Sequence, residues 1–250
     1  MKRKLVAALA CRNQGTRLYG KPLQNLDIDK GITILDYMIK SLKTYEVIDE
    51  IVLSICEGNH NKVYKDIAEK HNIKYTFGDE EDVLDRLIKS TDYVEGTDIF
   101  RLTSESPYTY FEMINHGWER HVKNDLDLTA LDGVPDGSGF EIIKLDAYKK
   151  SHYSGESRHR SELCSLYIRE NKDNFKIQKL SAPKSIRRTD IRLTVDLPED
   201  LVLCRAVYQH FKSLAPLIPL EEIISFVDSR DDLKKLVDPF IEQGLKNMYL

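Results

Sequence analysis

Residues 4–23 read KLVAALACRNQGTRLYGKPL and join a short apolar run to a basic loop. The apolar run, residues 4–10, predicts a buried strand. Further predicted strands and amphipathic helices alternate along the chain, with strands at 51–55, 73–77 and 98–103 and helices at 33–43, 61–71 and 82–90. Apolar strands that alternate with helices are typical of a mostly parallel, doubly wound sheet, which binds ligands beyond the carboxyl ends of its strands.

The loop after the first predicted strand carries three cations around two glycines. Gly15 and Gly20 permit close backbone approach to a ligand, and Lys21 can neutralise phosphate oxygens as a point charge. Arg12 and Arg17 can do the same through bidentate hydrogen bonds. The loop does not match the P-loop pattern GxxxxGK[ST]. Its composition suits a triphosphate, although a solvated basic loop is an equally good interpretation of the residues alone.

The second half of the chain departs from this rhythm. Strands are predicted at 128–131 and 140–144, and residues 132–185 are expected to form an insertion or lid. A core strand is predicted at 191–195, and Pro198 followed by two acids predicts the start of a helix. We expect one domain over residues 1–250, with C-terminal helices from 198 to 250.

Composition excludes several classes of protein. The 37 basic and 41 acidic residues nearly balance, giving a net charge of −4, which argues against a nucleic-acid or membrane-surface partner. No apolar stretch approaches the roughly 20 residues of a membrane helix, and the N-terminal run lacks a signal-peptide cleavage site. The four cysteines, at 11, 56, 164 and 204, form no CxxC pair. We therefore expect a cytoplasmic protein.

Four motifs in order along the chain resemble those of the cytidylyltransferases that activate acidic sugars. They are ACRNQGTRLYGKPL (10–23), GDEEDVLDRL (78–87), RLTSESP (101–107) and RLTVDLPEDL (192–201). This group includes CMP-Kdo synthetases and acylneuraminate cytidylyltransferases, and the resemblance is strongest to the spore-coat polysaccharide biosynthesis protein F group. It implies a Rossmann-like fold of the nucleotide-diphospho-sugar transferase type, with a small dimerisation element.

The resemblance also implies a nucleotide site. Arg12 and Lys21 would act catalytically by stabilising the developing charge. The implied nucleotide-binding residues are Arg12, Gly15, Arg17 and Lys21 at the triphosphate, and Asp82 and Arg86 near the nucleotide pocket.

A magnesium site is implied between Glu105 and Asp196. Both acids follow predicted strands, so they can converge at one edge of the sheet, and carboxylates are suitable Mg²⁺ ligands. The alternatives are a helix cap for Asp196 and a solvated loop acid for Glu105. Ser104 and Glu105 stand where the family commonly has glycine and aspartate, so the exact position of the metal is left open.

Residues 137–143 and 157–171 resemble, in position, the acceptor-binding and dimer-forming parts of the spore-coat group. The implied acceptor ligands are Glu141, for hydroxyl groups, and Arg158, His159 and Arg160, for a carboxylate or phosphate. A solvated basic face is the alternative for the latter three. The same resemblance implies a homodimer.

Together these observations predict an Mg²⁺-dependent enzyme that transfers CMP from CTP to a small acidic sugar or related acceptor and releases pyrophosphate, for surface polysaccharide or glycoconjugate biosynthesis. The residues leave open another nucleotide, a phosphorylated or phosphonate acceptor, and a catalytically weak nucleotide-binding module.

Overall fold

A seven-stranded sheet organises the computed structural model, which describes residues 2–15 and 17–246 apart from the side chains of residues 243, 245 and 246. The strand order is β5-β4-β1-β6-β8-β7-β9. The first four strands are parallel, β8 is antiparallel to both its neighbours, and β9 is parallel to β7. This confirms the mostly parallel sheet. The strands are β1 (Leu5–Cys11), β4 (Glu50–Cys56), β5 (Lys74–Gly78), β6 (Asp98–Arg101), β7 (Leu128–Leu131), β8 (Phe140–Lys144) and β9 (Ile177–Leu180).

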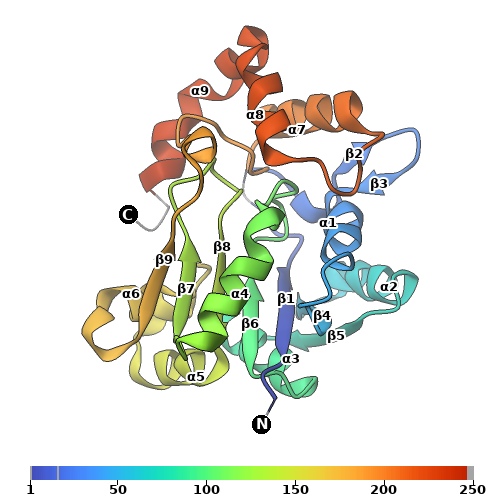
Figure 1. Cartoon of the computed structure of the whole chain (residues 1–250). Coiled ribbons are helices and arrows are strands. Elements are labelled where there is room, and N and C mark those ends of the chain that lie inside the picture. The colour runs from blue at the N-terminus through green and yellow to red at the C-terminus, as the bar shows by residue number, and fades with distance from the viewer. Residues whose placement is uncertain (1, 16, 247–250) are drawn as a thin grey trace.

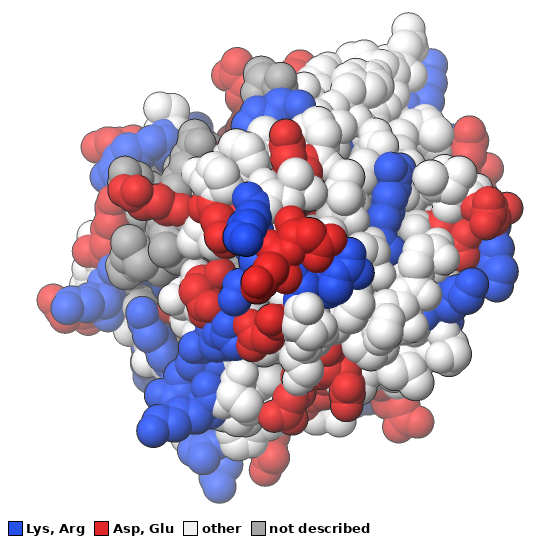
Figure 2. All heavy atoms as spheres, turned by 90° about the horizontal axis from the view of Figure 1, so that it is seen from above, with Lys and Arg blue, Asp and Glu red and all other residues white. Residues whose placement is uncertain are grey.

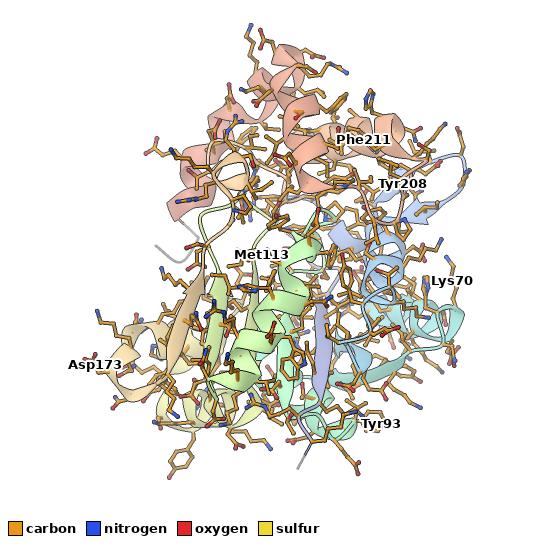
Figure 3. The ribbon with its side chains drawn as sticks, in the orientation of Figure 1. Lys70, Tyr93, Met113, Asp173, Tyr208 and Phe211 are labelled. Atoms are coloured by element: carbon orange, nitrogen blue, oxygen red, sulfur yellow. The ribbon has the colours of Figure 1, made fainter. Side chains whose placement is uncertain are left out.

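Helices cover both faces of the sheet (Figure 1). Alternate residues of β1 point to opposite faces, so that Leu9 packs in one core cluster and Ala8 in another. The Leu9 side is covered by helices α1 (Ile34–Leu42), α2 (Val63–Lys70) and α4 (Ile114–Lys123), and α7 (Pro198–Phe211) and α8 (Leu220–Asp228) join the same core cluster from the top of the view in Figure 1. The Ala8 side is covered by α3 (Val83–Tyr93), α5 (Leu145–Ser154) and α6 (Leu166–Glu170). Side chains fill the space between these layers, and Tyr208 and Phe211 mark α7 at the top of the view (Figure 3).

Local sequence signals explain where several helices begin. Thr33 and Asp36 form a reciprocal capping box at the start of α1. Asp82 accepts a hydrogen bond from the Asp85 amide at the start of α3. At the start of α7, the Asp200 carboxylate accepts the amides of both Asp196 and Leu197, each at 2.9 Å. These caps satisfy amides that have no partner inside a helix.

The second half confirms some sequence expectations and corrects one. β7 and β8 occupy the predicted positions, and β8 lies inside the main sheet between β6 and β7. The predicted strand at 191–195 is wrong, because this buried segment makes only a single bridge, between Arg192 and Asp136. Its amide and carbonyl groups pair with separate loops instead, as when the Val195 amide donates to the Glu105 carbonyl. The expected division into a single nucleotidyltransferase domain with a lid at 132–185 stays a prediction.

The chain ends in the predicted helices, α7, α8 and α9 (Asp231–Lys246). Leu233 and Val237 bury the first half of α9 in the main core. Residues 247–250 of the expected C-terminal helical region lie outside the described residues. A short hairpin of β2 (Asn25–Asp27) and β3 (Ile32–Thr33) precedes α1. Within the described part of the chain, no helix has both the length and the apolar character needed to cross a membrane.

Candidate functional site

The loop between β1 and the short helix at Lys21–Leu23 is fixed by several hydrogen bonds. The Gly20 amide donates to the Asn13 carbonyl at 2.9 Å, which closes the loop, and Gly20 adopts the left-handed conformation with φ of 58°. The Asn13 amide donates to the Asn61 side chain at 2.8 Å, and the Tyr64 hydroxyl donates to the Arg12 carbonyl at 3.1 Å. The backbone at both ends of the loop is thus held, and its basic side chains pair with Glu162 and Asp196.

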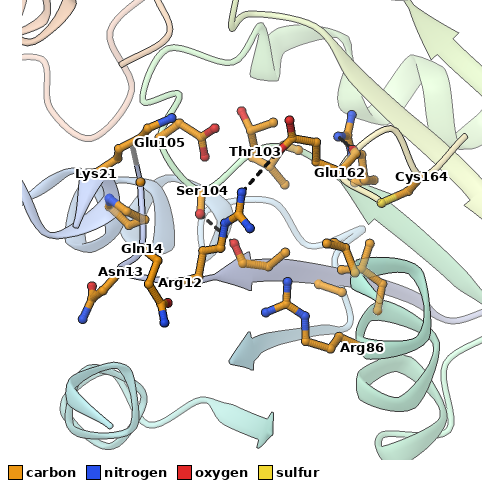
Figure 4. Close-up of a pocket in the computed structure, with 18 of the residues that line it drawn as sticks. Arg12, Asn13, Gln14, Lys21, Arg86, Thr103, Ser104, Glu105, Glu162 and Cys164 are labelled. Atoms are coloured by element: carbon orange, nitrogen blue, oxygen red, sulfur yellow. Dashed lines mark hydrogen bonds and ion pairs between the residues drawn. The ribbon is translucent and has the colours of Figure 1, made fainter. Parts of the chain in front are cut away.

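A first cavity opens between this loop, α3 and the carboxyl end of β6 (Figure 4). It gathers three of the predicted cations, Arg12, Lys21 and Arg86, and the predicted acid Glu105. The remaining lining residues are Ala8, Ala10, Asn13, Gln14, Gly15, Leu18, Pro22, Val83, Leu87, Arg101, Leu102, Thr103, Ser104, Glu162 and Cys164. Strand ends, a glycine-containing loop and cations are therefore combined where an α/β sheet is expected to bind its ligand.

Arg86 contributes a buried guanidinium to this cavity. Its side chain is 2% exposed, and neither Nε nor Nη1 donates a hydrogen bond to any residue that the structure describes. Burial lowers the pKa of Arg86, and the nearby charge of Arg12 acts in the same direction. Gly78 makes room for the side chain, because an added Cβ would lie 2.8 Å from Arg86 Cγ. Buried donors without partners are costly, which points to a ligand that accepts from them.

A second cavity adjoins the first and shares the charged residues Lys21, Arg101, Glu105 and Glu162 with it. It extends over the ends of β6, β7 and β8, and the space is bounded by Gly244 of α9. Its other charged lining residues are Arg17, Asp132, Asp136, Glu141, Arg169, Arg192 and Asp196. On the face at the carboxyl ends of the strands, acidic and basic side chains are interleaved (Figure 2). The two cavities therefore meet at a set of shared charged residues.

Asp196 lies in this second cavity with three cations around its carboxylate. Oδ1 is 2.5 Å from Lys21 Nζ and 3.3 Å from Arg17 Nη2, and Oδ2 accepts a hydrogen bond from Arg192 Nη2 at 3.1 Å. Burial would raise the pKa of Asp196, but these cations, Lys21 first, hold it below its ordinary value. Because Asp200 makes the capping bonds of α7, the Asp196 side chain is free of that role.

Glu105 is brought beside Asp196 by the hydrogen bond between its carbonyl and the Val195 amide, at 3.2 Å. Burial raises the pKa of this half-buried glutamate; Lys21 opposes the rise, and the negative charge of Asp196 adds to it. A divalent cation between the two carboxylates would relieve their repulsion. No group of three or more His, Cys, Asp or Glu residues suited to a metal occurs in the described ranges. Two carboxylates nevertheless fit Mg²⁺, which usually completes its octahedron with water and substrate phosphates.

Glu141 is almost fully buried in the wall of the second cavity. Its Oε1 accepts hydrogen bonds from Ser165 at 2.6 Å and from Arg169 at 2.7 Å. Its Oε2 accepts none from the described part of the chain, although Arg101 Nη1 lies 3.6 Å away. Arg169 also forms a bidentate pair with Asp132 at 3.0 and 3.1 Å. The network fixes Glu141 with one oxygen available to a ligand.

Other residues implied by the family resemblance lie elsewhere. Asp82 caps α3 and contacts His152 at 2.8 Å, outside the lining of both cavities. Arg158 and His159 contact the Glu170 carboxylate, at 2.6 and 2.9 Å, and Arg160 donates to the His152 carbonyl. None of these three lines either cavity, and their assignment as acceptor ligands stays a prediction.

The sequence interpretation missed Asp132, Arg169 and Arg192. Arg192 opens the motif at 192–201, and an arginine at the edge of an apolar segment could have indicated a buried ion pair. Asp132 and Arg169 meet only because of the sheet topology, and no local pattern indicates their pairing.

Solved structures share this arrangement of sheet and helices, which is the nucleotidyltransferase fold. A cytidylyltransferase from Leptospira borgpetersenii superposes with a TM-score of 0.80 at 19% identity, covering 100% of this chain and 99% of that one. A CMP:2-keto-3-deoxy-manno-octonic acid synthetase complexed with CTP gives a TM-score of 0.62 at 15% identity, covering 83% of this chain and 99% of its own. At these identities the likeness shows the fold alone.

Sequence comparison goes further. The cytidylyltransferase family model matches residues 7–236, and the chain belongs to this family. The spore coat polysaccharide biosynthesis protein SpsF of Bacillus subtilis is 29% identical over 230 residues, covering 90% of this chain and 94% of the relative. An uncharacterized protein of Methanocaldococcus jannaschii is 27% identical over 233 residues, covering 93% and 94%.

Proposed function

We propose that the protein is an Mg²⁺-dependent cytidylyltransferase that transfers CMP from CTP to a small acidic sugar or related acceptor and releases pyrophosphate. The observation that carries this proposal is the junction of the two cavities at Lys21, Glu105 and Asp196. There, a nucleotide held by the basic loop would meet an acceptor held in the second cavity. The family of the chain and the names of SpsF and the CMP:2-keto-3-deoxy-manno-octonic acid synthetase support a role in surface polysaccharide or glycoconjugate biosynthesis.

The first cavity would hold CTP. Arg12 and Lys21 would neutralise the triphosphate there, Arg17 would reach it from the second cavity, and Gly15 would allow its close approach to the backbone. Arg86 would face the base, since its unpaired donors require acceptors. Cytosine presents acceptors at both O2 and N3, whereas the N3–H of uracil would oppose a guanidinium donor. The geometry therefore favours CTP over UTP. Asp82 would act on the nucleotide pocket indirectly, by fixing the start of the helix that carries Arg86.

The chemistry needs little covalent help from the protein. An acceptor oxygen would attack the α-phosphorus in line while pyrophosphate leaves. Lys21 and Arg12 would stabilise the charge that develops on the phosphate oxygens. Glu105 and Asp196 would hold Mg²⁺, which when bound neutralises phosphate charge and orients the nucleotide.

The second cavity would hold the acceptor. Glu141 Oε2 is placed to accept a hydrogen bond from an acceptor hydroxyl. Arg158, His159 and Arg160 would serve an acidic group of the acceptor only if they are released from their contacts with Glu170 and His152.

The proposed setting is the cytoplasm, and the proposed assembly is a homodimer. All four cysteines are buried and free, which suits a reducing compartment. Light scattering should return about twice the chain mass of 29.0 kDa at micromolar concentration. A monomer at that concentration would remove the dimer from the proposal.

One experiment tests the proposed reaction. The purified protein is incubated with Mg²⁺, with CTP, UTP, GTP or ATP, and with a panel of 3-deoxy sugar acids and phosphorylated or phosphonate small molecules. Pyrophosphate release and the mass of the nucleotide product are measured. We expect a CMP-linked sugar acid from CTP. A product formed from another nucleotide or with a phosphonate would change the proposed nucleotide or the proposed acceptor accordingly. CTP binding without turnover on any acceptor would favour a nucleotide-binding module.

A further inference from the structure

The two oxygens of Asp196 have different kinds of partner. Oδ2 is held by Arg192, a side chain that is 2% exposed. Oδ1 contacts the ammonium of Lys21 at 2.5 Å and, farther away at 3.3 Å, the guanidinium of Arg17, and both residues belong to the loop after β1. One side of the carboxylate is therefore attached to the core, and the other to the proposed phosphate-binding loop.

Arg192 is fixed on every side. Its Nε and Nη2 donate to Asp200 at 2.7 and 3.0 Å, and its Nη1 donates to Asp136 at 2.5 Å. Gly244 of α9 packs directly against this pair, because an added Cβ would lie 2.6 Å from both Arg192 Nη1 and Asp136 Oδ2. A guanidinium with this many bonds in a close-packed site has little freedom to move.

Lys21 has an alternative position available. Its ammonium is a compact charge on a flexible stem, and the first cavity in front of it is where the triphosphate is proposed to bind. Mg²⁺ coordinates carboxylate oxygens at about 2.0–2.1 Å. The ammonium 2.5 Å from Oδ1 already neutralises this oxygen and would repel a metal ion placed beside it. Metal coordination at Oδ1 and the Lys21–Asp196 contact therefore compete.

We propose that Lys21 exchanges partners, holding Asp196 Oδ1 before the nucleotide binds and moving to the phosphate oxygens when the metal–nucleotide complex enters, while Arg192 holds Oδ2 throughout. This inference rests on the proposed function. The lysine thereby couples metal binding to nucleotide binding, because the triphosphate supplies the new partner that releases Asp196. Arg192 is a positioning residue in this scheme. An unusual consequence follows: removing Lys21 weakens turnover but strengthens metal binding in the absence of nucleotide.

Mn²⁺ binding measured by electron paramagnetic resonance tests the exchange without an acceptor. Wild type is compared with Lys21→Met and with Lys149→Met, which is a matched control. Lys149 forms an exposed ion pair with Asp92, with 2.8 Å between Nζ and Oδ1, and neither residue lines either of the two cavities. Each protein is titrated alone and with α,β-methylene-CTP. We expect wild type and the control to bind Mn²⁺ at least tenfold more tightly with the analogue, and Lys21→Met alone to bind at least tenfold more tightly than wild type alone.

Arg192→Lys supplies the second arm. This variant keeps a positive charge but loses the bonds that fix Oδ2. We therefore expect at least fivefold weaker Mn²⁺ binding in the presence of the analogue. The affinity for the nucleotide, measured without metal, should stay within twofold of wild type. Melting temperatures show which variants fold, and Lys21→Gln replaces Lys21→Met if that variant does not.

The outcomes separate the exchange from the proposed function. Equal Mn²⁺ affinity of Lys21→Met and wild type without nucleotide overturns the exchange, even if wild type remains an active cytidylyltransferase. Failure of every protein to bind Mn²⁺ with the analogue, while the analogue itself still binds, overturns the metal pair and the exchange together. Loss of analogue binding by wild type overturns the proposed function as well.

Discussion

The first cavity and the second are built in different ways. The first lies between the loop after β1, α3 and the end of β6, and Arg86 of α3 contributes a buried guanidinium with donors that no described residue accepts. The second is assembled from separate segments, and each arginine or lysine that lines it contacts an acid, as Arg169 contacts Asp132 and Glu141. The first therefore offers positive charge to a ligand, whereas the second offers a preformed, nearly neutral network. Triphosphate and acceptor have correspondingly different requirements.

This difference predicts how mutations should behave. Changes in the first cavity should reduce nucleotide binding or phosphate stabilisation, and changes in the second should alter use of the acceptor. Asp196, Lys21 and Glu105 lie where the cavities meet, so changes there should affect the reaction itself.

The largest effect is expected for Asp196→Asn. The amide keeps the size of the side chain but loses the charge that would bind Mg²⁺, so turnover should fall at least 100-fold, about 2.7 kcal/mol of barrier. Pyrophosphate release measured across Mg²⁺ and Mn²⁺ concentrations checks this. The melting temperature serves as the control, because the variant also removes ionic contacts with Lys21, Arg17 and Arg192. Full activity with an unchanged metal dependence would leave Asp196 with a structural role only.

Lys21→Ala should have the next largest effect. Without the ammonium, charge on the leaving pyrophosphate is less well stabilised, and turnover should fall at least tenfold, about 1.4 kcal/mol. Steady-state turnover at saturating CTP, with circular dichroism to show that the fold survives, is the measurement. Near-normal turnover by the folded variant would contradict the placement of Lys21 at the phosphates.

The contrast between the cavities also explains what sequence could predict. The basic loop beside the first cavity follows from consecutive residues: a buried strand at 4–10 is followed within 11–23 by two glycines and three cations, and the topology of a parallel sheet places this loop at the binding edge. The parallel strands were likewise predictable, since β1 and β4 are largely apolar and the strands alternate with amphipathic helices. Asp196 and Glu105 could be paired because each belongs to a recognisable motif near that edge.

The second cavity could not be predicted in this way. Asp132 and Arg169 are 37 residues apart and meet because β8 inserts antiparallel between β6 and β7. Residues 191–195 are apolar enough to predict a strand, yet among the described residues they form one isolated bridge, so the segment pairs with loops and turns Arg192 toward three acids. For Asp82 the sequence suggested a ligand contact where the structure shows a helix cap, because an aspartate that binds a ligand and one that caps a helix occur in the same local pattern.

Glu141→Gln should have a smaller effect, confined to the second cavity. The amide preserves the shape of the side chain but replaces one carboxylate oxygen with a donor, so the KM for the acceptor should rise about fivefold, about 1 kcal/mol. The Kd for CTP should stay within twofold, since Glu141 does not line the first cavity. Initial rates with varied acceptor, and calorimetry with CTP, give the two values. A larger change in CTP affinity than in acceptor KM would break the division between the cavities.

The smallest effect is expected for Glu105→Asp, which restores the shorter acid of the family pattern at the junction. A small shift of Mg²⁺ or an added water ligand can compensate for the shorter side chain, so turnover should stay within about threefold of wild type while the Mg²⁺/Mn²⁺ preference changes.

Burial raises the pKa of Glu105, and the metal needs the ionised form, so wild-type turnover should be present above that pKa and decline as the pH falls through it. Because the ordinary pKa of aspartate, about 3.9, lies below the glutamate value of about 4.3, the acid side of the profile should move to lower pH in the variant. A pH series at saturating CTP and metal measures the shift. An identical profile in Glu105→Asp and in Glu105→Gln would show that this carboxylate does not control the acid limb, and would leave Asp196 and the nucleotide phosphates as the metal ligands.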